Sequence, residues 1–251
     1  MRKSQIAVLS VFAGLIVVIV AMIVAARIIV AQIQSSEYAG APPSGARDTE
    51  RTAQRAAESL DLTGFERIDA RGTWEITLRQ GADWDVELDY SPDLEERLRV
   101  RVDGDRLVLA YERGNWSWWR DIGGNRNRVA ATIVMPALEA VDVSGAAELR
   151  FTGFSGEALA ITVSGAADID GSDGRYEALD LTVSGAGDVN LGDVVVDDAR
   201  LVLSGAADVM LNMNGGDLSG TISGAGKVRY RGSIDTQNVS MSGFSSIEPI
   251  D

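Results

Sequence analysis

Apolar and polar residues alternate along most of the chain from Phe65 onward. Segments 74–78 (WEITL) and 98–102 (LRVRV) place an apolar residue at every second position, and a turn-forming Asp-Gly-Asp at 103–105 follows the second segment. A period of two puts the apolar side chains on one face of a strand. The pattern therefore predicts a series of short, half-buried strands, with one helical turn over 93–98.

From Val143 onward the alternation becomes a repeat. A Ser-Gly-Ala phrase returns at a spacing of 20 residues and then of 19, and a last, eroded copy reads MSGFSSI over 241–247. The serines of the six copies are Ser144, Ser164, Ser184, Ser204, Ser223 and Ser242. Apolar residues alternate before each Ser-Gly, a shorter apolar stretch follows it, and there is no helical stripe. Such self-similarity marks a chain that coils, so that each repeat stacks on the next and buries a shared core.

Twenty residues with two short strands correspond to about one coil of a parallel β-helix, whose coils stack at ~4.8 Å. We therefore predict an all-β fold over 62–251, a single-stranded parallel β-helix (β-solenoid) with coils of about 20 residues. Residues 63–140 would supply the opening coils and a cap. Glycine at each corner would let successive coils approach closely. The eroded copy at 242–247 is typical of a terminal coil.

The N-terminal part of the chain has a different pattern. Residues 6–26 are apolar or small without interruption, and Arg2 and Lys3 precede them. About 20 apolar residues span a bilayer, and the positive-inside rule places the N-terminus in the cytoplasm. We expect residues 1–33 to form an uncleaved signal anchor, a transmembrane helix, rather than a cleaved signal peptide. A linker over 34–61 follows, in which 47–60 either form a short exposed helix or lack order.

Composition narrows the chemistry. The 251 residues include no cysteine and no histidine, which excludes disulfides, thiol catalysis, Ser-His-Asp catalysis and histidine-bound zinc. Residues 1–33 hold three of the 23 basic residues and none of the 37 acidic ones, so the rest of the chain has a net charge of −17. An acidic domain repels nucleic acid, and we expect no nucleic-acid partner.

Several motifs occur in one order along the chain. They are FERI at 65–68, GTWEITLRQG at 72–81, an Asp-Gly hairpin at 103–104 before alternating leucines, IVMPAL at 133–138, and the repeated Ser-Gly-Ala corners. In these motifs and in their order, residues 62–247 resemble the head GIN domain family of autotransporter-adhesin type. The resemblance implies a right-handed parallel β-helix in an exported bacterial protein. It implies no catalytic residues, and the predicted anchor departs from a freely secreted form.

One stretch breaks the alternation. Trp116, Trp118 and Trp119 lie within four residues, and Arg120 follows them. Flat aromatic side chains beside arginine can stack on sugar rings or bind anionic groups of an envelope polymer, so these four residues are our candidate binding site. The alternative is a loop that covers a side or an end of the solenoid, where open strand edges need protection.

The repeated phrase also carries a column of acidic residues: Glu148, Asp168, Asp188 and Asp208. We expect each carboxylate to accept backbone N–H bonds at its own turn and to face solvent. A calcium ladder over Asp168, Asp188 and Asp208 is a minority hypothesis, because Lys227 continues the column where a ligand would be needed. We assign no metal and no cofactor. A carboxylate that recurs in every coil is typical of a structural position, so we do not expect an enzyme.

These observations favour a non-enzymatic cell-envelope binding or adhesion module presented on a β-solenoid. Its expected partners are the membrane, through the N-terminal helix, and an envelope glycan or protein. The domain would be exported, to the periplasm or the cell exterior, and anchored in the membrane. One alternative is a membrane-tethered structural or regulatory envelope protein that acts through self-assembly as a homo-oligomer or through protein partners. A polysaccharide-active enzyme is a weaker alternative.

Overall fold

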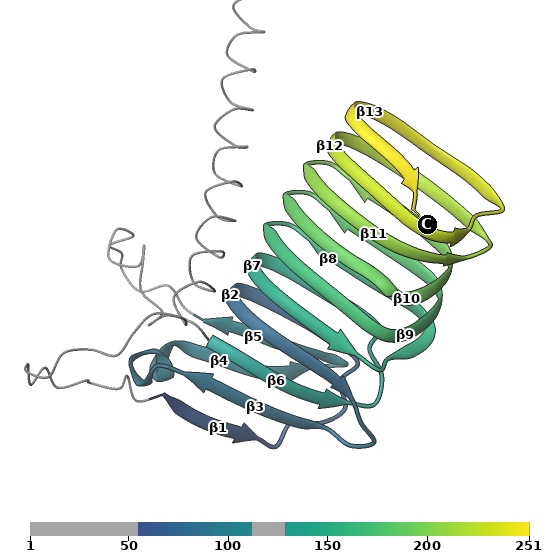
Figure 1. Cartoon of the computed structure of the whole chain (residues 1–251). Coiled ribbons are helices and arrows are strands. Elements are labelled where there is room, and N and C mark those ends of the chain that lie inside the picture. Colours follow the sequence, from purple (N-terminus) through teal and green to yellow (C-terminus); the bar gives the residue numbers. More distant parts are fainter. Residues whose placement is uncertain (1–54, 112–128, 251) are drawn as a thin grey trace, which may run out of the picture. The chain divides into compact units, whose positions relative to one another are not determined.

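The computed structural model describes residues 55–111 and 129–250, which lie within one compact unit, Arg51–Asp251 (Figure 1). The predicted anchor over 1–33, most of the predicted linker over 34–61, and the candidate binding residues at 116–120 lie outside the described residues. Among the described residues the helical structure is a six-residue 3-10 helix, η1 (Pro92–Arg97). None of the described helical structure is long enough to span a membrane.

The described strands form one continuous sheet that winds into a β-solenoid of about six turns (Figure 1). The N-terminal strands are β1 (Ala56–Leu60), β2 (Arg67–Gln80), β3 (Asp85–Tyr90), β4 (Leu98–Asp103), β5 (Arg106–Tyr111) and β6 (Val129–Met135). The strands of the repeat region are β7 (Ala140–Thr152), β8 (Ser155–Val163), β9 (Ala166–Val183), β10 (Ala186–Leu203), β11 (Ala206–Asn214), β12 (Asp217–Ser233) and β13 (Thr236–Pro249). The predicted all-β solenoid is therefore confirmed.

Successive coils of the repeat region pair in parallel, and equivalent residues lie side by side on both sides of the Ser-Gly corner, with register shifts near 190–195 at the opposite bend. Asp168 pairs with Asp188, and Val183 pairs with Leu203, one period further along the chain. Each coil has two halves, joined by the Ser-Gly corner. The half after the corner has an outward surface that we call the carboxylate face. The outward surface of the half before the corner is called the threonine face. The sequence period thus sets the register directly.

The apolar positions of the alternation point into the solenoid. Ile161 and Val163 before a corner and Ile169 after it are fully buried, whereas Thr162 between the first two is partly exposed. Burying one such branched side chain contributes roughly 1.5–3 kcal/mol relative to leaving it in water. Because equivalent residues repeat in every coil, the core is a set of continuous apolar columns.

Each corner requires a glycine because the backbone of the preceding coil lies very close to it. A Cβ atom on Gly185 would lie 2.0 Å from the carbonyl oxygen of Gly165. The backbone hydrogen bonds continue through the corner, since the amide of Ser184 donates to the carbonyl of Val163 at 2.8 Å. Only a residue without a side chain leaves room for this stacking.

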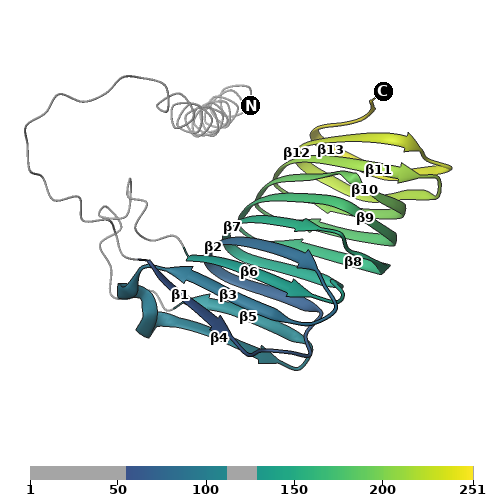
Figure 2. The same ribbon diagram turned by 60° about the horizontal axis from the view of Figure 1, so that its bottom comes forward.

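The opening coils are not wound in chain order. Strand β2 pairs in parallel with β5 over 67–71 and with β6 over 74–80, and its other edge pairs with β7. It therefore lies between the β5–β6 coil and β7, although it precedes both in the sequence (Figures 1 and 2). Strands β1 and β3 add antiparallel pairs beyond β6, and β4 pairs antiparallel with β5.

The expectation of a short helix over 47–60 is wrong for its described part. Ala56–Leu60 is strand β1, which pairs antiparallel with β3, with Ala56 opposite Tyr90. The phenol of Tyr90 also donates to the Glu58 carboxylate at 2.9 Å. An apolar helix face as thin as this one gains little by packing, whereas the strand satisfies the open edge of β3. The helical turn expected near 93–98 is confirmed as η1.

Candidate functional site

The carboxylate face presents straight outward columns. After one corner the outward residues are Ala166, Asp168 and Asp170, and the next coil places Ala186, Asp188 and Asn190 beside them. The column nearest the corner is made mainly of alanines and the second mainly of carboxylates, and the third is mixed, since Met210 follows Asp170 and Asn190. A flat face of small residues bordered by hydrogen-bonding groups is thus repeated at the strand spacing of ~4.8 Å.

The carboxylate column runs through Glu75, Glu148, Asp168, Asp188 and Asp208, and Lys227 and Ser246 continue it. All of these residues lie within strands rather than at turns. The sequence-based expectation that each carboxylate sits at its own turn is therefore wrong about position. The reason is that the corner is only two residues long, and the strand has resumed before the acid is reached.

Arginines of the third column pair with two carboxylates of this column, Glu148 and Asp208. Arg150 pairs with Glu148, and the Arg229 guanidinium lies 2.9 Å from the Asp208 carboxylate. Between these pairs, partial burial and the neighbouring Asp188 raise the pKa of Asp168. In the third column the amide of Asn190 donates to the Asp170 carboxylate at 2.7 Å. The middle of the face is thus its most acidic part.

Within residues 55–111 and 129–250, no group of three acidic side chains is arranged to hold a metal ion. Calcium needs oxygen ligands that converge at 2.3–2.6 Å on one point. Asp168, Asp188 and Asp208 instead follow one another along a flat column, each on its own strand. The geometry gives the calcium hypothesis no support in this part of the chain.

The threonine face carries Thr162, Thr182, Val202, Thr221 and Ser240 in one outward column. At its N-terminal end the same column holds Asp142 and then Asp69. This threonine column is therefore uncharged over the repeat region, and its charges lie beside the opening coils, whereas other outward positions of the same face carry charged residues such as Asp180 and Arg200.

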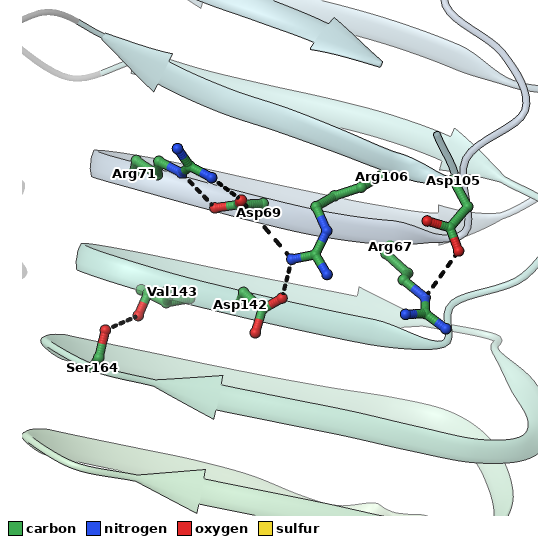
Figure 3. A network of polar contacts seen from close by, with 8 residues as sticks. All are labelled: Arg67, Asp69, Arg71, Asp105, Arg106, Asp142, Val143 and Ser164. Carbon is green, nitrogen blue, oxygen red and sulfur yellow. Dashed lines mark hydrogen bonds and ion pairs between the residues drawn. The ribbon is translucent and has the colours of Figure 1, made fainter. Parts of the chain in front are cut away.

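An ion-pair network connects three strands of the opening coils (Figure 3). The carboxylate of Asp69, with a side chain only 8% exposed, accepts two bonds from Arg71, at 3.0 Å from Nε and 2.6 Å from Nη2. Arg106 of β5 lies between Asp69 and Asp142 and pairs with both. The network ties β5 and β7 to the two edges of β2.

A second set of ion pairs lies at the start of β2. Arg67 contacts Asp105 at 3.2 Å and Glu139 at 3.1 Å. Burial and the neighbouring Glu139 carboxylate raise the pKa of Glu66. The arginines of both sets have carboxylate partners, so their arrangement serves to hold strands together. Sequence reasoning missed these residues, although the period of two does place Asp69 and Arg71 on one face.

The structure positions the two ends of the segment that holds Trp116, Trp118, Trp119 and Arg120. Before it, Ala110 of β5 pairs with Arg71, and after it, Val129 of β6 pairs with Trp74. The segment therefore stands in the chain where later coils have their two-residue Ser-Gly corner. Whether these residues bind a ligand or cover the solenoid stays a prediction.

Comparisons with known proteins agree with this architecture. Residues 64–195, just over half of the chain, match the family described as "Putative auto-transporter adhesin, head GIN domain". A structure of a putative adhesin from Bacteroides fragilis is 18% identical, covers 79% of this chain and 98% of its own, and superposes with a TM-score of 0.65. At this identity the likeness concerns the fold alone.

Two structures from Parabacteroides distasonis are more distant. A putative lipid binding protein is 13% identical over 80% of this chain and 98% of its own, with a TM-score of 0.45. A putative adhesin is 16% identical over 79% and 98%, with a TM-score of 0.40. A comparison with curated proteins found no match. The order of the motifs, the stacked Ser-Gly corners and the family match together show that the chain belongs to the head GIN domain family.

Proposed function

We propose that this chain is a non-enzymatic binding module of the bacterial cell envelope. Its binding surface is the outer face of a right-handed β-solenoid, and residues 1–33 anchor it in the membrane. The family description and the similar adhesin structure support an adhesion-like role in general terms. The observation that carries the proposal is the periodic carboxylate face, on which the same outward groups recur in register in coil after coil.

A periodic face suits an extended ligand. Each coil repeats one contact at ~4.8 Å, so a polymer lying along the solenoid axis would gain many weak contacts that add up. An acid–base centre, in contrast, needs two groups whose environments push their pKa values apart. The repeated carboxylates occupy equivalent positions in successive coils and form no single paired centre. This supports binding over turnover.

The ligand class that fits is a neutral or amine-bearing glycan. A carboxylate such as Asp170 accepts hydrogen bonds from hydroxyl groups, and an amide such as Asn190 both donates and accepts them. The alanine column leaves room for a ring to approach. The net charge of −17 outside residues 1–33 disfavours polyanionic polymers. We include Trp116, Trp118, Trp119 and Arg120 in this proposal, as groups that would stack on sugar rings.

The test is retention of the full chain, in detergent micelles, on immobilised purified envelope glycans. The double variant Asp168→Asn/Asp188→Asn should lose at least tenfold in retention, as should the triple alanine variant of Trp116, Trp118 and Trp119. The matched control is Glu157→Gln/Asp180→Asn, which removes two exposed charges away from the carboxylate face. Equal losses in the double variant and its control would overturn the proposal, as would the absence of glycan retention by the unmodified chain.

A further inference from the structure

Strand β13 forms an open end of the described solenoid. One of its edges pairs with β12 along its whole length, from Asp217 opposite Thr236 to Tyr230 opposite Pro249. Within the described ranges no strand pairs with the other edge. A strand of 14 residues with an open row of backbone donors and acceptors is a template for pairing with another chain.

The same end exposes large apolar side chains, at one position that is buried one coil earlier and at one, Phe244, that follows the exposed Ala225 in the outward alanine column. Met241 occupies the position of Ile222, and its exposure is 50% compared with 1%. Phe244 is 83% exposed, and these two are the exposed large hydrophobic residues of the described chain. Ile247, which follows the buried Val228 in its column, is only partly buried. Apolar surface gathered at one end marks an interaction site.

Charge does not protect this edge. Natural edge strands are usually blocked by charged residues, and β4 at the other end of the unit carries Arg99, Arg101 and Asp103. Strand β13 has one charged residue, Glu248, which is paired with Lys227 at 3.2 Å. Over β12 and β13 the charged residues are three basic and two acidic: Lys227, Arg229, Arg231, Asp217 and Glu248. The chain as a whole has a net charge of −14, but this end is close to neutral. Two such ends therefore repel each other less than other parts of two copies would.

We propose that the open edge of β13 is an interface between two copies of this chain, which join end to end. The edge has two halves, one on each face of the solenoid, around a single apolar cross-section. A lone peptide strand could pair with one half only. A second copy has the same circumference, so a two-fold arrangement pairs both halves, covers Met241 and Ile247 of the inward columns, and leaves the outward Phe244 at the border of the interface.

The absence of cysteine allows a clean test. Single cysteines replace Ser240, in the threonine-face half of β13, or Ser246, in the carboxylate-face half, and the full chain in detergent micelles is treated with a short bismaleimide. Both variants should give a cross-linked dimer. Ser184→Cys, an exposed corner in the middle of the stack, is the matched control and should stay at least tenfold less cross-linked.

Two further changes test the edge itself. Met241→Lys points a charge into the open end, and Phe244→Glu adds a charge at an exposed position. Each change should reduce cross-linking of the Ser246→Cys variant at least tenfold. The melting temperature should stay within a few degrees of the unmodified chain. Equal cross-linking at Ser184→Cys would assign association to another part of the chain. The absence of a dimer at both β13 positions, or a dimer that neither charge disrupts, would overturn the proposal. Glycan retention is measured separately, so the two proposals can fail independently.

Discussion

The carbonyl oxygen of Gly145 lies 2.0 Å from the point that a Cβ atom on Gly165 would occupy. The same contact recurs between Gly165 and Gly185 and between Gly185 and Gly205. The obstacle in each case is backbone of the neighbouring coil, which cannot rotate away as a side chain can. The corners therefore need glycine, because the backbone of the neighbouring coil occupies the place where a Cβ atom would lie.

Gly165→Ala should destabilise the domain by about 2–4 kcal/mol, because the coils must separate at the corner to admit a methyl group. Chemical denaturation monitored by circular dichroism measures this change. Gly187→Ala is the control, since Gly187 stands in register with Ala167 and Ala207 of the adjoining coils. The nearest contacts of its Cβ would be the side chains of Val183, at 3.2 Å, and Val189, at 3.9 Å. A loss of more than about 1 kcal/mol in the control would contradict this account.

Val183→Asp should cost several kcal/mol, because Val183 is completely buried and a carboxylate there has no partner in the apolar column. The variant should unfold at a much lower temperature or fail to fold. Thr182→Asp places the same side chain on the outward neighbour and should stay close to the unmodified protein in thermal melting. Similar melting temperatures for the two variants would count against the inward orientation of Val183.

Asp69→Ala should cost about 2–3 kcal/mol, because the buried carboxylate accepts two bonds from Arg71 and also faces Arg106. The control is Asp103→Ala, which removes a carboxylate 3.9 Å from Arg101 where both side chains are more than half exposed. Exposed pairs of this kind contribute at most about 1 kcal/mol. Equal stability losses, measured by urea denaturation, would show that the Asp69 network does not hold the opening coils.

Asp168→Asn should stabilise the domain at neutral pH. Burial and Asp188 raise the folded-state pKa of Asp168, so the folded state binds this proton more tightly than the unfolded state does. Stability from this group is therefore lost as the pH rises through its folded-state pKa, and the asparagine variant avoids that loss. Its advantage should disappear in acid, below the unfolded-state pKa.

Asp180→Asn is the control for the titration, since the neighbours of Asp180 in its own column are Ala160 and Arg200. Removing that carboxylate relieves no repulsion, so no gain at neutral pH is expected. Thermal melting of both variants across the acid range distinguishes the two cases. A constant difference between Asp168→Asn and the unmodified chain at all pH values would contradict the assignment.

The chain's own pattern determined the solenoid and its register. The alternation at Leu159, Ile161 and Val163 marks the buried face, and the spacing of 20 residues brings Asp168 beside Asp188. Both signals are local or strictly periodic, so they can be read without knowing which strands meet. The glycine at each corner belongs to the same repeat, and the neighbouring backbone carbonyl, which lies too close to admit a Cβ atom, explains why that position holds no larger residue.

Only the tertiary structure decided how the opening strands are arranged. No local signal places β2 between β5 and β7, since parallel pairing joins residues far apart in the chain and depends on which edges are free. The Asp69–Arg106–Asp142 network exists only because of that arrangement, and β1 becomes a strand only because β3 offers it an edge. Regular repetition can be read from the sequence because each coil meets a copy of itself, whereas the opening strands meet partners that the neighbouring residues do not specify.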